Sequence, residues 1–304
     1  MKSPVFLAGP TAVGKSAIAL ALAEKIGGEI ISVDSMQVYR GLDLGTAKPT
    51  ADERKKIPHH LLDVCDLNAA FDAAKFVQFA EKSVAEIQSR NRTPIFCGGT
   101  GLYFKAFISG LGEAPPADEK VRAELESLPY EKLLHELRER DPECYEKIDK
   151  ENPRRVIRAV EVIRLTGKKF SAQKSAWDSA SRITHHSSRL ICFTRAAEDL
   201  HARINARVDE MFARGLVNET RELLKHGLAE NKFAMQAIGY RQVVEHLRGE
   251  KNLPDTIELV KIKTRQFAKR QLTWFRRHGN CEWMELQPTD TANSVAEKLS
   301  GGKN

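Results

Sequence analysis

Near its amino terminus the chain reads Gly9-Pro10-Thr11-Ala12-Val13-Gly14-Lys15-Ser16, which fits the phosphate-binding pattern G-x-x-x-x-G-K-[ST]. The flanks fit as well. Residues 5–8 are an apolar run typical of a buried strand, and residues 16–26 are an alanine-rich stretch typical of a helix. An ordinary glycine-rich strand-to-helix turn would not need all four fixed residues of the pattern. The stretch therefore predicts a P-loop between a strand and a helix.

The chemistry of this loop follows from its backbone. Its two glycines let the chain curl so that N–H groups point inward, and the start of the following helix adds positive potential. Lys15 is then placed to contact the outer phosphate of a diphosphate, and the Ser16 hydroxyl is placed to bind Mg²⁺. The motif predicts a bound diphosphate or triphosphate without indicating which.

The composition of the chain is that of an ordinary globular protein. Its 304 residues are 41% hydrophobic and 29% charged, and the net charge of +7 with a pI of about 9.1 favours a polyanionic partner. No apolar run reaches the roughly 20 residues of a membrane helix. The first residues lead straight into a strand, so we expect a cytoplasmic protein without a signal peptide. Its scattered cysteines, never spaced C-x-x-C, predict neither structural zinc nor a disulfide framework.

Further apolar runs predict the rest of an α/β fold. We expect strands over residues 29–33, 93–97 and 189–194, and helices over residues 71–90, 102–108 and 200–214, with a last long helix that opens at Asp255. Strands that alternate with helices indicate a central parallel sheet flanked by helices. Together with the P-loop, this pattern predicts a P-loop NTPase-like core.

Polar residues follow two of these strands. Asp34 comes directly after residues 29–33, and Gly98-Gly99-Thr100-Gly101 follows residues 93–97. Ligands of open α/β sheets bind at the carboxyl ends of strands. We therefore expect Asp34 near the phosphate loop and Thr100 in contact with substrate, although a close-packing turn explains the glycines equally well. The strand over residues 93–97 has no terminal carboxylate, which argues against a typical ATPase.

Residues 36–49 lack a clean period and predict a long functional loop. The His59-His60 pair that follows suggests a metal site. Adjacent side chains point apart, however, and Asp63 alone is a poor third ligand. Positioning or structural roles are therefore expected for the two histidines.

Two irregular segments suggest how the chain is divided. Residues 110–116 are rich in glycine and proline, and the polar residues 181–188 have the character of a return linker. The predicted parts are the first part of the P-loop core (residues 1–113), a helical insertion domain (residues 114–188) and a mostly helical second part of the core (residues 189–304).

Two helices carry clusters of basic residues. Asn152-Pro153 predicts the start of the first helix, where spacing supports two interpretations of Arg154 and Arg158 equally: a solvated face paired with Glu161, or a grip on a phosphate backbone. In the last helix Lys261, Arg265 and Lys269 recur at every fourth position, and no carboxylate follows Glu258 until Glu282. A merely solvated face would include carboxylates, so we expect this stripe to contact an anion.

Taken together, the motifs resemble those of the bacterial tRNA dimethylallyltransferases, also called tRNA isopentenyltransferases. The resemblance runs in family order over nearly the whole chain, and no motif position departs from the family pattern. Besides the P-loop, it is carried by Asp34-Ser35-Met36-Gln37-Val38-Tyr39-Arg40-Gly41, Gly45-Thr46-Ala47-Lys48-Pro49, His59-His60-Leu61-Leu62-Asp63, Gly98-Gly99-Thr100-Gly101-Leu102-Tyr103, Asn152-Pro153-Arg154-Arg155, Gly239-Tyr240-Arg241-Gln242 and Thr264-Arg265-Gln266-Phe267-Ala268-Lys269-Arg270-Gln271.

The resemblance implies transfer of a dimethylallyl group from dimethylallyl diphosphate to N6 of the adenosine 3′-adjacent to the anticodon in tRNA, by a monomer with Mg²⁺ as cofactor. The P-loop would hold a diphosphate leaving group rather than ATP. Lys15, a magnesium ion on Ser16 and the N–H groups of residues 11–16 would neutralise it, with Arg265 as a further clamp. Asp34 would be the general base, or alternatively an outer-shell ligand of magnesium.

The resemblance also implies contacts with the anticodon stem-loop, from which the target base would be flipped into a pocket. That nucleotide and its neighbours would contact Asp34, Ser35, Met36, Gln37, Thr100, Gln236, Ala237, Ile238, Gly239, Tyr240 and Arg241. The RNA backbone would be gripped by Arg122, Arg154, Arg155, Val156, Ile157 and Arg158. Rival interpretations are an adenylate isopentenyltransferase that uses free AMP or ADP, a P-loop small-molecule kinase and an RNA-binding module.

Overall fold

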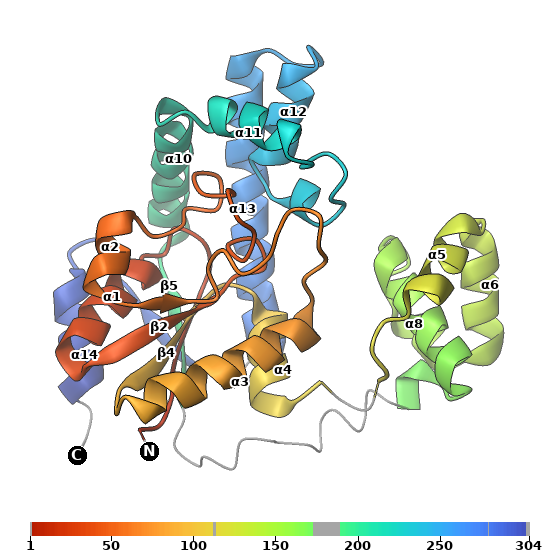
Figure 1. Ribbon diagram of the computed structural model, residues 1–304, viewed down its shortest axis with the longest axis horizontal. Helices are drawn as coiled ribbons and strands as arrows, with labels where there is room; N and C mark the ends of the chain where they lie inside the picture. The colour runs from red at the N-terminus through yellow and green to blue at the C-terminus, as the bar shows by residue number, and fades with distance from the viewer. Residues whose placement is uncertain (1, 112–113, 173–188, 279, 302–304) are drawn as a thin grey trace. The chain divides into compact units, whose positions relative to one another are not determined.

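The computed structural model describes residues 2–111, 114–172, 189–278 and 280–301, and it divides into two compact units (Figure 1). The larger unit comprises Met1–Phe104 and His185–Asn304, and the smaller unit comprises Lys105–Thr184. The smaller unit overlaps the predicted insertion domain but begins at Lys105 rather than at residue 114. The linker predicted over residues 181–188 lies outside the described residues.

One parallel sheet forms the centre of the larger unit, with the strand order β3-β2-β4-β1-β5-β6. The strands are β1 (Val5–Ala8), β2 (Gly28–Val33), β3 (His59–His60), β4 (Thr93–Gly98), β5 (Leu190–Thr194) and β6 (Glu282–Glu285). The four strands predicted from apolar runs are confirmed, and so is the α/β fold class. The sequence pattern misses the edge strands because β3 has only 2 residues and β6 is mostly exposed.

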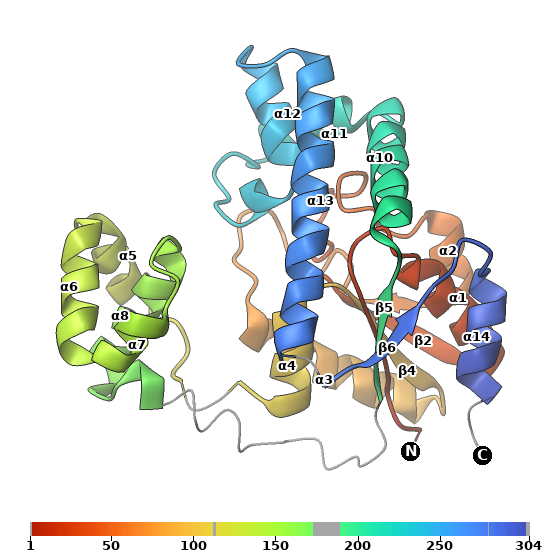
Figure 2. The same ribbon diagram turned by 180° about the vertical axis from the view of Figure 1, so that it is seen from behind.

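Helices cover both faces of this sheet (Figures 1 and 2). In chain order the helices are α1 (Lys15–Ile26), α2 (Ala51–Lys56), α3 (Ala73–Ser89), α4 (Gly101–Ser109), α5 (Glu119–Ser127), α6 (Tyr130–Arg140), α7 (Pro142–Lys147), α8 (Pro153–Thr166), α10 (Ala197–Ala213), α11 (Leu216–Lys225), α12 (Tyr240–Leu247), α13 (Leu253–His278) and α14 (Ala292–Gly301). The chain steps from β1 across β4 to β2 through α1, and it returns to β4 through α3. Because such crossovers are right-handed, α1 and α3 lie on opposite faces.

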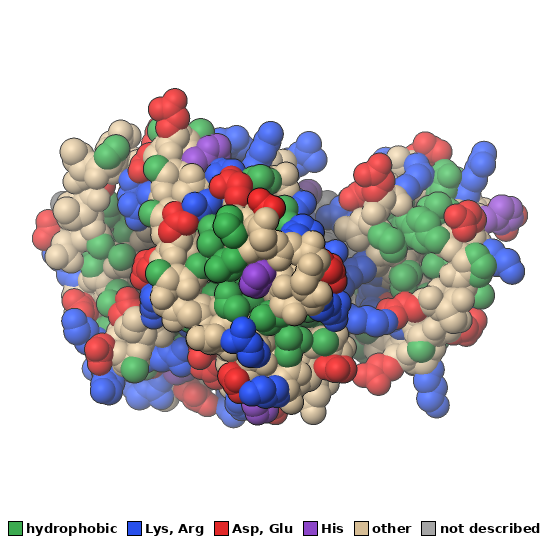
Figure 3. Space-filling model, turned by 90° about the horizontal axis from the view of Figure 1, so that it is seen from above, with side chains coloured by type: hydrophobic (Ala, Val, Ile, Leu, Met, Phe, Trp, Pro, Cys, Tyr) green, Lys and Arg blue, Asp and Glu red, His purple; other side chains and the backbone are tan. Residues whose placement is uncertain are grey.

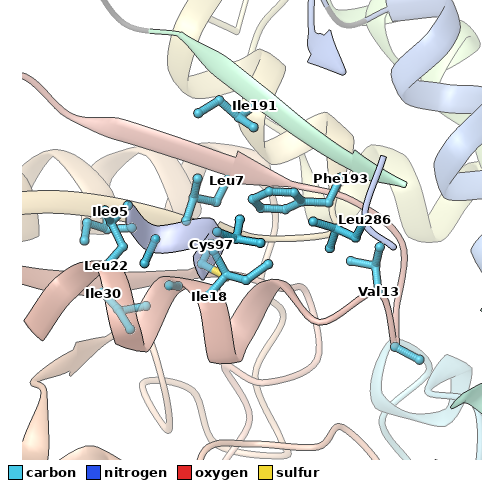
Figure 4. Close-up of a cluster of buried hydrophobic side chains, with 14 of the residues drawn as sticks. Leu7, Val13, Ile18, Leu22, Ile30, Ile95, Cys97, Ile191, Phe193 and Leu286 are labelled. Atoms are coloured by element: carbon cyan, nitrogen blue, oxygen red, sulfur yellow. The ribbon is translucent and has the colours of Figure 1, made fainter. Parts of the chain in front are cut away.

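Strand β1 is buried on both faces, which fixes the P-loop that follows it. Leu7 packs with α1 and with Phe193 of β5 in one hydrophobic cluster (Figure 4). Phe6 points to the other face, where its ring centroid lies 4.9 Å from that of Phe96 and 6.4 Å from that of Phe104. Each buried side chain of this size contributes about 2 kcal/mol of stability. The strand that carries the P-loop is therefore anchored from both sides.

The long basic helix is α13, and its cap differs from the predicted one. Asn252 Oδ1 accepts a hydrogen bond from the backbone N–H of Asp255 at 2.9 Å, and the helix begins at Leu253. The prediction that this helix opens at Asp255 is therefore wrong. A shorter helix, α14, follows it and packs against α1.

Cysteine pairing also differs from the sequence expectation. Cys192 of β5 forms a disulfide with Cys281, which directly precedes β6, and their Cα atoms are 5.7 Å apart. With a sequence separation of 89, the pair leaves no signal in the spacing of the cysteines. Cys65, Cys97 and Cys144 are buried and are not in disulfide bonds.

The described residues contain neither a metal-binding cluster nor a membrane-spanning helix. Within residues 2–111, 114–172, 189–278 and 280–301, no group of three or more His, Cys, Asp or Glu side chains could hold a metal ion. None of the helices in these ranges combines the length and apolarity needed to cross a membrane.

The smaller unit has a hydrophobic core of its own. Its helices α5 to α8 bury a set of apolar side chains that includes Leu125, Leu133, Leu137, Val156 and Val160. The predicted helix between Asn152 and Gly167 is confirmed as α8. Its apolar face accounts for the valine and isoleucine positions that alternate with the arginines.

Candidate active site

The P-loop has the backbone geometry that its motif requires. Gly9, Ala12 and Gly14 have positive φ angles of 150°, 63° and 107°, so the chain curls tightly between β1 and α1. A Cβ added to Gly9 would lie 2.9 Å from the backbone oxygen of Phe193, so β5 excludes any side chain at this position. Helix α1 begins at Lys15 without a side-chain cap. Its first N–H groups are therefore directed at the space where an anion would bind.

Two N–H groups of the loop are already engaged. The backbone N–H of Thr11 donates to Oε1 of Gln271 at 2.9 Å, and that of Val13 donates to the Pro10 oxygen at 3.4 Å. Of the N–H groups of residues 11–16 expected to hold the leaving group, these two are therefore bonded within the protein in this structure. The anion site is left to the N–H groups at the start of α1.

Lys15 lies half-buried at the start of α1, where its Nζ donates to the Pro10 oxygen at 3.1 Å. Burial lowers the pKa of its ammonium group, and the charge of Arg207 adds to this effect, whereas Cys97 and Asp34 oppose it. An anion bound beside Lys15 would favour its charged form. The side chain therefore suits a phosphate contact.

Three arginines that the sequence analysis does not single out hold the P-loop from the side of β5 and α10. Arg195 Nε donates to the Val13 oxygen at 2.8 Å, and Arg203 Nε donates to the Ala12 oxygen at 2.9 Å. Arg207 Nη1 donates to Thr11 Oγ1 at 3.3 Å. These side chains link the loop to β5 and α10, which follow it in the chain by nearly two hundred residues.

Arg203 and Arg207 lie one turn apart on α10 and form a basic pair beside the P-loop. Burial lowers the pKa of the Arg207 guanidinium, and the nearby charge of Arg203 lowers it further. A desolvated guanidinium and a second, exposed one next to a phosphate loop favour a bound anion. The spacing argument applied to Arg154 and Arg158 would also have identified this pair.

Arg265 makes contacts that differ from the predicted clamp. Its guanidinium donates to Asn205 of α10 at 2.7 Å and to Glu258 of its own helix at 3.0 Å. Lys261 of the same stripe pairs with Asp209 of α10 at 2.7 Å. The carboxylate that pairs with Lys261 belongs to a different helix, which the spacing within α13 cannot reveal. In this structure these two residues join α13 to α10, and the anion contact expected of them stays a prediction.

Asp34 is held at the carboxyl end of β2 by the turn that follows it. Its Oδ1 accepts hydrogen bonds from the N–H groups of Met36 at 2.8 Å and Gln37 at 3.2 Å. Its Oδ2 accepts no hydrogen bond from any residue that the structure describes. The carboxylate is thus fixed through one oxygen, and the other remains available to a substrate.

Thr100 lies beside this turn. Its Oγ1 accepts a hydrogen bond from the N–H of Ser35 at 3.2 Å, which leaves the hydroxyl proton for a donor role. The glycines around it permit close packing. A Cβ at Gly99 would lie 2.1 Å from Gln271, and one at Gly101 would lie 2.0 Å from Trp274. The structure is therefore compatible with both interpretations of residues 98–101. The glycines allow close packing, and the Thr100 hydroxyl between them lies near Asp34, where it could contact substrate.

The loop after Asp34 is ordered by buried polar contacts. Gln37 donates to the Thr46 oxygen at 3.0 Å and accepts from Ser32 at 2.8 Å. The Lys48 side chain is 1% exposed and pairs with Asp43 and Asp63. As expected for a functional loop, residues 36–49 contain no helix and no long strand.

The paired histidines have structural partners. His60 Nε2 lies 2.8 Å from a carboxylate oxygen of buried Glu29, and His59 Nδ1 lies 2.7 Å from the backbone oxygen of Ile57. The two rings are thus engaged separately, which agrees with the structural role expected for them.

The residues from Gln236 to Arg241 are split between surface and core. Gln236 and Arg241 are exposed, and the Arg241 guanidinium lies 3.4 Å from Glu245. Ala237 and Tyr240 are buried. The Tyr240 hydroxyl donates to Glu219 and accepts from the N–H of Gly45. Burial therefore leaves the side chains of Ala237 and Tyr240 no surface for RNA, and Tyr240 supports the loop at Gly45 instead.

In the smaller unit, Glu161 forms salt bridges with two of the predicted RNA-binding arginines. Its carboxylate is fully buried and accepts from Arg122 at 2.8 Å and from Arg158 at 2.7 Å. The salt-bridge interpretation of Arg158 is thus the one that the structure shows. The Val156 side chain is fully buried and cannot touch RNA, whereas Arg155 is exposed.

Surface charge is mixed on the face seen from above. Acidic and basic side chains are interspersed there over both units (Figure 3). The net charge of +7 is therefore not gathered into one patch on this face.

A cavity of about 590 Å³ opens beside the P-loop in the larger unit, and its lining includes Ser16, Ser32, Gln37, Cys97, Arg207 and Met211. Asp34 and Thr100 do not line it, although Gln37 of the Asp34 turn does. Burial raises the pKa of the Cys97 thiol to about 11, with Lys15 opposing the shift. This thiol is therefore protonated at neutral pH and is a poor nucleophile.

The chain matches the family described as IPP transferase over residues 37–278. It is 44% identical over 287 residues to the tRNA dimethylallyltransferase of Geobacter metallireducens, with 92% of each chain covered. It is also 44% identical over 300 residues to that of Geobacillus thermodenitrificans, covering 96% of this chain and 94% of the relative.

Solved structures agree with these relatives. The tRNA delta(2)-isopentenylpyrophosphate transferase of Staphylococcus epidermidis is 35% identical, with a TM-score of 0.72, and the match covers 99% of this chain and 98% of that one. A eukaryotic dimethylallyltransferase acting on tRNA is 28% identical, with a TM-score of 0.82, and the match covers 99% of this chain and 78% of that one. The chain therefore belongs to the tRNA dimethylallyltransferase, or IPP transferase, family.

Proposed function

We propose that this chain transfers a dimethylallyl group from dimethylallyl diphosphate to N6 of the adenosine 3′-adjacent to the anticodon in tRNA and releases diphosphate. The names of its relatives support tRNA prenylation. The structural observation that carries the proposal is a P-loop backed by Arg203 and Arg207, with Asp34 at the carboxyl end of another strand of the same sheet.

The P-loop side would stabilise the leaving group. The allylic C–O bond breaks as negative charge develops on the departing diphosphate, so fixed positive charge there lowers the barrier. Lys15, Arg207 and the free N–H groups at the start of α1 supply that charge. This reaction needs no carboxylate for ATP hydrolysis, and β4, with the sequence TPIFCG, carries none.

Mg²⁺ would add positive charge to the same diphosphate. Ser16 would hold it, because this side chain is exposed, lines the cavity and makes no hydrogen bond to the described residues. One protein hydroxyl suits an ion that is otherwise bound by substrate phosphates and water.

Asp34 would act as the general base. The adenine amine loses a proton as N6 bonds to the allylic carbon, and Oδ2 of Asp34 is the free oxygen that would accept that proton. General-base assistance of this kind is typically worth about 10²- to 10⁴-fold in rate. The hydroxyl of Thr100, which is bonded to the N–H of Ser35, would orient the target adenine after it has been flipped from the RNA stack.

The assay that tests the proposal compares possible acceptors and donors side by side. The protein is incubated with Mg²⁺, dimethylallyl diphosphate and either tRNA or free AMP, and the nucleosides are then analysed by mass spectrometry. We expect a prenylated adenosine from tRNA alone. Prenylation of free AMP would indicate an adenylate isopentenyltransferase instead, and phosphate transfer from ATP in a parallel reaction would indicate a kinase.

A further inference from the structure

Gln271 of α13 joins the two sides of the candidate site through a single buried amide. Its Oε1 accepts a hydrogen bond from the N–H of Thr11 in the P-loop at 2.9 Å. Its Nε2 donates to the backbone oxygen of Gly99 at 3.0 Å. The side chain is 7% exposed, and both ends of its amide are satisfied. One side chain thus touches the loop that would bind diphosphate and the turn that carries Thr100.

The contact with the turn is close enough to determine the residue at position 99. A Cβ added to Gly99 would lie 2.1 Å from Nε2 of Gln271 and 3.2 Å from the Gly9 oxygen. Any side chain at this position would displace the amide from the turn. The glycine and the glutamine therefore form one arrangement rather than two independent features.

Packing alone does not require an amide at this position. Neighbouring positions of α13 that face the core, such as Ala268 and Phe275, are buried and apolar. A methionine would cover the same surface without needing hydrogen-bond partners, whereas an amide is costly to bury unless both of its ends are bonded. What the amide adds over an apolar side chain is a fixed direction and distance between its two partners.

The contacts continue from Gly99 to the proposed base. The next residue, Thr100, accepts the N–H of Ser35 at 3.2 Å, and Ser35 directly follows Asp34. A continuous path thus runs from Thr11 to the Asp34 turn. Hydrogen bonds join Thr11 to Gln271, Gln271 to Gly99 and Thr100 to Ser35, and peptide bonds supply the remaining links. It crosses from the loop that would bind the donor to the carboxylate that would deprotonate the acceptor.

We propose that Gln271 is a positioning residue that sets the distance between the diphosphate held by the P-loop and the adenine held beside Asp34. The inference rests on the proposed function. Group transfer needs the attacking nitrogen and the allylic carbon within about 3–3.5 Å, and a misplacement of about 1 Å can cost about 10²-fold in rate. Gln271 touches neither reacting atom, so it acts through the two backbones that it joins.

The first test replaces Gln271 with methionine, which keeps the length of the side chain and removes both hydrogen bonds. We expect the single-turnover rate of the preformed complex with tRNA and dimethylallyl diphosphate to fall by about 10²-fold. We also expect the directly measured affinities for tRNA and for inorganic diphosphate to stay at the wild-type values. Gln266→Met is the matched control, because Gln266 is an exposed glutamine on the same helix.

The second test is Gln271→Glu, which keeps the acceptor for Thr11 and loses the donor to Gly99. Protonation of the glutamate restores a donor, and burial raises the pKa of a carboxyl group. The rate of this variant relative to wild type should therefore rise as the pH falls from about 8 to about 6. A fold-stability defect would instead leave this ratio independent of pH while the protein remains folded.

Three results would overturn the inference. One is a wild-type single-turnover rate in Gln271→Met, and another is a flat pH ratio for Gln271→Glu. The third is a fall in the two affinities as large as the fall in rate, which would mean that the amide only keeps the loops folded. A wild-type protein that prenylates no RNA would contradict the proposed function itself and is thereby distinguished from these outcomes.

Discussion

The Arg207 guanidinium of α10 donates a hydrogen bond to the hydroxyl oxygen of Thr11 in the P-loop, at 3.3 Å. This contact places a half-buried cation beside the loop from a helix that begins at Ala197. A phosphate loop of this kind is therefore completed by a distant part of the chain. The loop motif by itself does not define the anion site.

Replacing Arg207 with methionine should impair the donor side of the reaction. Loss of one fixed cation at a developing negative charge typically costs about 10²- to 10³-fold in turnover. We expect a fall of that size in kcat/KM for dimethylallyl diphosphate, with the affinity for tRNA unchanged. Arg221→Met is the control, since Arg221 is exposed and donates to Asn218. Unchanged kinetics in Arg207→Met would remove Arg207 from the diphosphate site.

Asp34→Asn should separate catalysis from binding. The amide oxygen can still accept the N–H groups of Met36 and Gln37, so the turn keeps its shape, but the side chain can no longer take a proton. Single-turnover rates should fall by about 10²- to 10⁴-fold while the affinity for tRNA is retained. Normal turnover of bound complex combined with lost tRNA binding would contradict the assignment of the base. Asp52→Asn, at an exposed acid of α2, is the matched control.

Arg155 and Arg158 of α8 should behave differently although they are neighbours. Arg158→Ala removes one of two guanidinium partners from buried Glu161, and it should lower the free energy of unfolding by about 2 kcal/mol, the typical value of one hydrogen bond to a charged group. Arg155→Ala should leave stability unchanged and should reduce the slope of log affinity for tRNA against log salt by about 1. Denaturant unfolding and binding titrations at several salt concentrations measure both effects. A reduced salt slope without a loss of stability in Arg158→Ala would instead indicate that Arg158 contacts the RNA backbone.

Acid should weaken the loop through Asp63. Burial alone would raise the pKa of its carboxyl group, but hydrogen bonds from Lys48 and Arg54 outweigh this and hold the pKa below its usual value. A carboxylate with a depressed folded pKa stabilises the protein above its unfolded value, about 4, and this stability is lost as pH falls through the folded pKa.

The Tm difference between wild type and Asp63→Asn should therefore be constant above about pH 5 and shrink below about pH 4. Thermal unfolding across that range measures it. A Tm difference that persists unchanged into acid would show that the Asp63 charge is not the stabilising element. Asp52→Asn serves again as the exposed control.

Local patterns predicted much of the fold and the centre of the site. Apolar runs predicted the four central strands because these are buried on both faces, and the P-loop motif predicted the curl between Gly9 and Gly14. The position of Asp34 followed from its place at the end of β2. Each of these features depends on residues that are close together in the chain.

The features that were missed depend on contacts between distant segments. Arg203 reaches Ala12, and Gln271 reaches Thr11 and Gly99, across separations that no spacing rule covers. Arg265 looked like an anion clamp because its partner Asn205 belongs to another helix. Val156 and Tyr240 belong to motifs that are polar overall and were predicted to contact RNA. Their own side chains, however, are buried in the core.

The central claim is that this chain prenylates one adenosine of the anticodon loop. The direct measurement is mass spectrometry of nuclease fragments from an anticodon stem-loop RNA incubated with the protein, Mg²⁺ and dimethylallyl diphosphate. The account predicts a mass gain of one dimethylallyl group only on the fragment that contains the adenosine 3′-adjacent to the anticodon, and no gain when that adenosine is replaced by guanosine. No mass gain, or a gain on any other nucleotide, would contradict it.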